Sequence, residues 1–133
     1  MKIHESAENY LETILVLQKR NGQVRSIDIV NELEFTKPSV SVAMKNLRQS
    51  GMIDMDASGY ITLLDEGRAI AEKIFERHTL LTDWLIHLGV APDVADKDAC
   101  RLEHVLSADS FEAIKRSYRA DSKSSSELPS HLL

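Results

Sequence analysis

The 133-residue sequence predicts a mostly α-helical protein. Apolar residues recur at helical spacing in several segments, and only 5 glycines and 3 prolines interrupt the chain. Hydrophobic residues make up 43% and charged residues 28%, which is typical of a chain that folds. So few breaking residues argue against a β-sandwich with many turns, and the length allows one large domain or two small ones.

Two helices are expected at the start of the chain. The first covers about residues 7–17 and ends at Asn21-Gly22. The second is short and runs over residues 26–33. Apolar residues at helical spacing define both: Tyr10, Leu11, Ile14, Leu15 and Leu17, then Ile29, Val30 and Leu33.

A third helix and a β-hairpin follow. Thr36 can cap the helix, and Pro38 lies in its first turn, where a missing N–H does no harm. Gly51 closes the helix, and its inward stripe is Val40, Ala43, Met44 and Leu47. The alternating runs 52–56 and 60–63 then predict a hairpin.

The rest of the chain is expected to be helical up to a C-terminal tail. Helices are predicted over about residues 65–88, 92–106 and 109–118. The last twelve residues are rich in serine. We therefore expect an N-terminal domain of residues 1–64, a helical domain of residues 65–120 and a disordered tail of residues 121–133.

Helix, short helix, turn, helix and hairpin, in this order, form a winged helix-turn-helix. The outer face of the third helix is polar, so this helix can lie in a DNA major groove about 12 Å wide. The whole chain has a net charge of −5, yet residues 19–48 hold six basic and three acidic residues. A locally basic face can bind DNA in an acidic protein. An ordinary helical domain with a solvated third helix is the alternative.

Base contacts are expected from the polar face of the third helix. Asn46 can pair with adenine, Lys45 with guanine or phosphate, and Val42 can pack on a thymine methyl group. Thr36 at the helix N-terminus suits a phosphate, as do the arginines. The complete set of expected DNA contacts is Arg25, Thr36, Lys37, Pro38, Ser39, Ser41, Val42, Lys45, Asn46 and Arg48.

A candidate metal site lies in the second half of the chain. Cys100, Glu103 and His104 stand at positions i, i+3 and i+4, so they share one helix face. Thiolate, carboxylate and imidazole together suit a divalent transition metal. His78 is in register with the apolar residues of the long helix and is a further candidate. A core histidine bonded to a carbonyl group is the alternative for His78.

The first helix offers additional oxygen ligands. Glu12 lies in an apolar neighbourhood, which is costly for a carboxylate without a partner. Glu8 or Asn9 lies one turn away and could complete a coordination shell with it. An exposed helix carboxylate is the alternative for Glu12.

Four segments resemble the diphtheria toxin repressor and manganese transport regulator family. They are Ser6-Ala-Glu-Asn-Tyr-Leu-Glu-Thr-Ile14, Lys37-Pro-Ser-Val-Ser41, Arg77-His78 and Ala99-Cys-Arg-Leu-Glu-His-Val-Leu-Ser107. The resemblance implies a homodimeric, metal-activated transcriptional repressor of metal-uptake genes that binds a palindromic operator. Residues 1–64 would be its DNA-binding domain, and residues 65–120 its dimerisation and metal-binding domain.

The resemblance also implies the ligands. Glu12, His78, Cys100, Glu103 and His104 match family ligands. Asn9 stands where manganese-type members carry Asp, and its amide oxygen is a weaker ligand than a carboxylate. Asp96 stands where iron-type members have a second-site histidine. A metal held by these residues would link the first helix to the second half of the chain.

The expected metal is Mn²⁺ or Fe²⁺. Cys100 matches the iron-type members, whereas Glu12 and the two-domain length match the manganese type. Zn²⁺, Co²⁺ or Ni²⁺ can also bind in vitro, because affinity alone does not identify the physiological metal.

No enzymatic activity and no small-molecule substrate are expected, because the sequence lacks a Gly-rich loop, a His-Glu-x-x-His motif and a Ser/His/Asp arrangement. The longest uncharged stretch runs from Trp84 to Pro92, far below the roughly 18–20 residues of a membrane span. A single cysteine suits the cytoplasm. The alternative function is a winged-helix regulator that responds to a non-metal effector or a partner and keeps a vestigial metal site.

Overall fold

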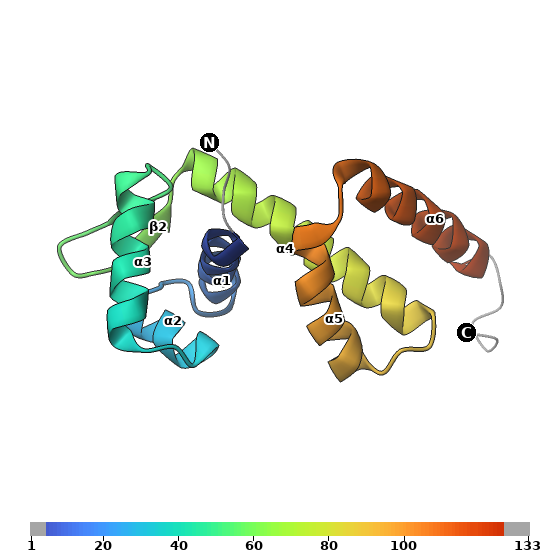
Figure 1. The fold of residues 1–133 in the computed structure, drawn as a ribbon, viewed down its shortest axis with the longest axis horizontal. Helices are drawn as coiled ribbons and strands as arrows, with labels where there is room; N and C mark the ends of the chain where they lie inside the picture. The colour runs from blue at the N-terminus through green and yellow to red at the C-terminus, as the bar shows by residue number, and fades with distance from the viewer. Residues whose placement is uncertain (1–4, 127–133) are drawn as a thin grey trace. The chain divides into compact units, whose positions relative to one another are not determined.

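The computed structural model describes residues 5–126, and their side chains as far as residue 121. The chain divides into two compact units between Phe75 and Glu76. Figure 1 shows the elements, whose order is α1 (Glu5–Asn21), α2 (Ser26–Leu33), α3 (Lys37–Gln49), β1 (Ile53–Met55), β2 (Ile61–Leu63), α4 (Asp65–His87), α5 (Pro92–Val105) and α6 (Ala108–Ser126). This order confirms the predicted, mostly helical fold class.

The N-terminal unit is a winged helix-turn-helix. Helix α1 packs against α2, α3 and β2, and β1 pairs antiparallel with β2 so that Ile53 lies opposite Leu63. One apolar core joins these elements, and the predicted inward stripe of α3 lies in it: Val40, Met44 and Leu47 are buried and Ala43 is half-buried.

The turn between α2 and α3 is built as the sequence predicts. Thr36 is the N-cap of α3, and its Oγ1 accepts a hydrogen bond from the backbone N–H of Ser39 at 3.3 Å. Pro38 lies in the first turn of the helix. Glu34 ends α2 in the left-handed conformation, with φ 57°. This compact turn fixes the start of α3.

The first turns of α4 belong to the N-terminal unit. Ala71 is fully buried in its core, and the half-buried Ile70 and Phe75 pack against the same core. Gly67 lies so close to Met52 that a Cβ atom at this position would overlap with the carbonyl oxygen of Met52. The two compact units divide within α4, between Phe75 and Glu76, and the domain boundary at residue 64 stays a prediction.

The C-terminal unit has its own apolar core. Leu81 of α4, Ala99 of α5 and Phe111 of α6 are buried together. Half-buried apolar residues pack around them: Leu80, Trp84, Leu102, Leu106 and Ile114. This packing fixes the faces that α4 and α5 present to each other.

Helix α6 extends well beyond the predicted end at about residue 118, so that prediction is wrong. The ring of Tyr118 lies 5.6 Å from the ring of His87, and the Oδ2 atom of Asp121 lies 3.9 Å from His87 Nε2. These contacts hold the later turns of α6 against α4, although the sequence there is rich in serine. Residues 127–133 of the predicted tail lie outside the described part of the chain.

No helix in the described part of the chain is both long and apolar enough to cross a lipid bilayer.

Candidate metal centre and candidate DNA interface

His78 lies between two carboxylates in the C-terminal unit. Its Nδ1 atom is 2.9 Å from Oε2 of Glu103, and its Nε2 atom is 2.8 Å from Oδ1 of Asp96. Asp96 and Glu103 are seven residues apart on α5, so two helical turns place them on the same face. The Glu103 side chain is fully buried, whereas the Asp96 side chain is 64% exposed.

Glu103 carries a buried oxygen that lacks a hydrogen bond. Its Oε1 atom has no hydrogen-bond partner among the described side chains, although Nε2 of His104 lies 3.3 Å away. The side chain of His104 is itself only 2% exposed. A buried carboxylate oxygen without a partner is unfavourable, and a cation beside it would remove that cost.

These donors fit a divalent transition metal. Imidazole nitrogens and carboxylate oxygens are typical ligands of such ions. A metal-bound histidine usually donates its second ring N–H to a carboxylate, which fixes the ring. His78 has a carboxylate beside each ring nitrogen. One nitrogen can therefore bind the metal while the carboxylate at the other nitrogen orients the ring. Asp96 can either bind the metal itself or orient the His78 ring.

The contacts of the C-terminal unit bring together four of the predicted ligands: His78, Asp96, Glu103 and His104. Cys100 lies on the same helix with an exposed side chain, and its role as a ligand stays a prediction. Glu12 and Asn9 are half-buried residues of α1 in the N-terminal unit, and their role also stays a prediction.

Arg77 is a residue of this site for which the sequence predicted no role. It is 7% exposed, and its Nη1 atom donates hydrogen bonds to the backbone carbonyls of Glu103 and Leu106. The spacing of Arg77 could have indicated that it is buried, because it lies three residues after Ile74 and four before Leu81, on the buried face of α4.

The ten predicted DNA contacts are all exposed in the N-terminal unit. Arg25 precedes α2, Thr36 caps α3, and the others lie along α3: Lys37, Pro38, Ser39, Ser41, Val42, Lys45, Asn46 and Arg48. Val42 is 59% exposed, on the side of the helix away from the buried stripe. Helix α3 thus presents a polar face with one apolar position.

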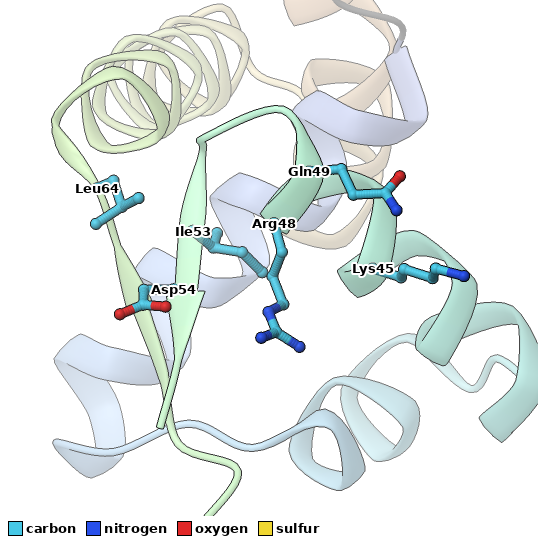
Figure 2. Close-up of a pocket in the computed structure, with 6 residues that line it drawn as sticks. All are labelled: Lys45, Arg48, Gln49, Ile53, Asp54 and Leu64. Atoms are coloured by element: carbon cyan, nitrogen blue, oxygen red, sulfur yellow. The ribbon is translucent and has the colours of Figure 1, made fainter. Parts of the chain in front are cut away.

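A groove separates the C-terminal half of α3 from the hairpin. A pocket of about 510 Å³ is lined there by Lys45, Arg48, Gln49, Ile53, Asp54 and Leu64. Figure 2 shows Arg48 pointing into the space between α3 and β1, while Lys45 points away from the strand. A neighbouring pocket of about 380 Å³ also has Lys45 and Arg48 in its lining. Two cations at one groove suit a DNA phosphate.

Arg25 lies against the hairpin. Its guanidinium group is 4.4 Å from the centroid of the Tyr60 ring, and its backbone N–H donates a hydrogen bond to Asp28 at 2.8 Å. The cation–π contact limits the positions that the Arg25 side chain can adopt. A positive charge is therefore held beside Tyr60, at the turn end of the hairpin.

Comparison with known protein families gives two matches. Residues 2–59 match the family described as iron dependent repressor, N-terminal DNA binding domain. Residues 64–123 match the family described as iron dependent repressor, metal binding and dimerisation domain.

Curated relatives agree with these matches. The transcriptional regulator MntR of Escherichia coli is 32% identical over 111 residues, which cover 84% of this chain and 72% of MntR. The iron-dependent repressor IdeR of Mycobacterium tuberculosis is 27% identical over 106 residues, which cover 79% of this chain and 46% of IdeR. The first is named as a transcriptional regulator and the second as an iron-dependent repressor, so neither is named as an enzyme.

A solved structure of a manganese-dependent transcriptional repressor in complex with manganese has a similar fold. Its TM-score is 0.76 at 27% sequence identity, and the match covers 84% of this chain and 51% of that one. This chain thus spans about half the length of the solved repressor.

Proposed function

Because this chain belongs to the diphtheria toxin repressor and manganese transport regulator family of metal-dependent transcriptional repressors, we propose that it is a homodimer that binds Mn²⁺ or Fe²⁺ and then a palindromic operator. Its targets would be genes of metal uptake. The observation that carries this proposal is the buried Glu103 carboxylate, which has an oxygen without a hydrogen bond and a histidine on each side.

His78, Glu103 and His104 would hold the metal in the C-terminal unit. The ion would supply the positive charge that the buried carboxylate lacks. Asp96 would be a further ligand or would orient His78, and Cys100, Glu12 and Asn9 are the other ligands that the sequence predicts. Oxygen and nitrogen donors suit Mn²⁺ and Fe²⁺, and the thiol of Cys100 would shift the preference toward the softer ion.

The polar face of α3 would read the operator. Asn46, Lys45 and Val42 would contact base edges, because they are exposed side chains of one helix. Arg48 and Arg25 would bind backbone phosphates, since the first lines the groove beside the hairpin and the second stacks on Tyr60. Two such faces in a homodimer would match the two half-sites of a palindrome.

Metal and operator would strengthen each other's binding. If the metal raises operator affinity by some factor, the operator must raise metal affinity by the same factor. Coupling of this kind is typically about 1–3 kcal/mol, which corresponds to roughly 5–150-fold in affinity.

The test is operator binding by fluorescence anisotropy under anaerobic conditions. Protein stripped by a chelator is titrated with Mn²⁺ and separately with Fe²⁺, and Glu103→Gln and Cys100→Ala are measured beside the wild type. Glu112→Gln is the matched control, because it neutralises an exposed carboxylate of α6 in the same unit. Tightening by about 5–150-fold is expected in the wild type and the control, and its loss is expected in Glu103→Gln.

Equal operator affinity with and without metal, on protein shown to be metal-free, would contradict the proposal. It would favour a regulator that responds to another effector.

A further inference from the structure

Arg77 connects three helices of the C-terminal unit. It belongs to α4, and its Nη1 atom donates to the carbonyl oxygens of Glu103 at 3.1 Å and of Leu106 at 3.0 Å, at the end of α5. Its guanidinium group also lies 5.0 Å from the ring centroid of Phe111 in α6. A single side chain therefore contacts the ends of two other helices.

The carbonyls that Arg77 binds are those that a helix end leaves without partners. Helix α5 ends at Val105, and the N–H of Leu106 donates to the carbonyl of Leu102. The carbonyl of Glu103 lies beyond that last hydrogen bond, so it has no partner within the helix. A cation at a helix C-terminus also opposes the negative end of the helix dipole. Arg77 is thus a buried cap on the last turn of α5.

This arrangement is costly if Arg77 serves packing alone. No carboxylate pairs with Arg77 among residues 5–121, and its Nε atom has no hydrogen-bond partner there. A buried cation without a counter-charge is unfavourable, whereas an apolar side chain of similar volume would fill the same space at lower cost. A guanidinium group differs from an apolar side chain here in that it donates the two hydrogen bonds to the end of α5.

The last turn of α5 is also the turn that carries Glu103 and His104. We propose that Arg77 is the positioning residue of the metal centre, because its cap on this turn holds both side chains in place beside His78. The inference rests on the proposed function, since it assumes that this cluster binds a metal. Helix ends without partners open readily, so without Arg77 the ligands would separate and metal affinity would fall.

The test measures Mn²⁺ affinity in the full chain without DNA, by electron paramagnetic resonance of the unbound ion. Arg77→Met keeps the apolar stem and removes both hydrogen bonds. Arg77→Lys keeps the charge and can reach a carbonyl, but it lacks the planar fork. Ile114→Ala is the matched control, because it loosens the same apolar core and changes neither the hydrogen bonds nor the ring contact of Arg77.

Arg77→Met should weaken Mn²⁺ binding by about 10–100-fold, the usual effect of removing a group that orients ligands. Hydrogen exchange should show lost protection at the amide of Leu106 in the metal-free protein. Arg77→Lys should bind Mn²⁺ more tightly than Arg77→Met and less tightly than the wild type. If Arg77→Met did not fold, the Mn²⁺ affinity of Arg77→Lys would test the inference in its place. Ile114→Ala should lower the melting temperature and change Mn²⁺ affinity by less than about threefold.

Mn²⁺ affinity of Arg77→Met within about threefold of the wild type would overturn the inference, and so would an equal loss in Ile114→Ala. Glu103→Gln separates this failure from failure of the proposed function. If the wild type binds Mn²⁺ and Glu103→Gln does not, an unaffected Arg77→Met refutes the role of Arg77 alone. If the wild type does not bind Mn²⁺ or Fe²⁺, the proposed function fails as well.

Discussion

Gly67→Ala tests the contact between α4 and the hairpin within the N-terminal unit. The new Cβ atom would overlap with the carbonyl oxygen of Met52 and would lie 2.9 Å from its carbonyl carbon. These atoms belong to the backbone, so they cannot rotate away as a side chain would. The start of β1 or of α4 must move instead, and the hydrogen bond from the N–H of Leu64 to the Met52 carbonyl, now 2.9 Å long, would be strained.

The change in the free energy of unfolding is the balance of two unfavourable terms and one favourable term. Overpacking of this kind costs about 1–3 kcal/mol, and a weakened hydrogen bond adds roughly 0.5–1.5 kcal/mol. Alanine is the better helix former by about 1 kcal/mol, which offsets part of this. We expect a net loss of about 1–3 kcal/mol in the free energy of unfolding. The melting temperature should then fall by roughly 4–12 °C.

Thermal unfolding followed by circular dichroism measures this loss. Ala69→Gly is the control, because it makes the reverse exchange at an exposed position of the same helix. It should cost about 1 kcal/mol from helix propensity alone. If Gly67→Ala were as stable as the wild type or more so, helix propensity would outweigh the contact, and the reasoning from the Met52 backbone would be refuted.

Three further changes have defined outcomes. Glu34→Gly should raise the melting temperature by a few degrees, because glycine relieves about 1–2 kcal/mol of left-handed strain at φ 57°; an unchanged melting temperature would contradict this. Arg48→Ala should weaken operator binding and reduce the slope of log affinity against log salt by about 1, and an equal slope would exclude a phosphate contact. The hydrogen bond from Arg20 lowers the pKa of Glu32 below 4.5. Glu32→Gln should therefore destabilise the protein at neutral pH, and its difference from the wild type in urea unfolding should shrink as the pH falls through the lowered pKa; a difference independent of pH would argue against the ion pair.

The sequence predicted most of the N-terminal unit because its signals are local. The stripe of α3 recurs at helical spacing, and the Thr36 cap and Pro38 lie within one turn of the helix start. The end of α6 was missed because it depends on contacts of Tyr118 and Asp121 with His87, which lies more than thirty residues earlier. Composition alone does not reveal a partner on another helix.

The metal centre was predicted only in part, because local spacing shows which residues share a helix face but not which residues of other helices they contact. The spacing of Glu103 and His104 on α5 placed them on one face, and the register of His78 turned it toward the interior. Neither signal shows that His78 bridges Asp96 and Glu103, or that Arg77 binds the end of α5. Both features join α4 to α5, and they depend on how these helices pack.

Trp84 is the single tryptophan of the chain, and it packs against the core formed by Leu81, Ala99 and Phe111. Tryptophan fluorescence is therefore a probe of the C-terminal unit, whereas circular dichroism reports the helices of both units. Comparing the two unfolding curves would show whether the unit with the candidate metal centre melts together with the winged helix-turn-helix or separately from it. The same signal would show directly whether metal stabilises the C-terminal unit.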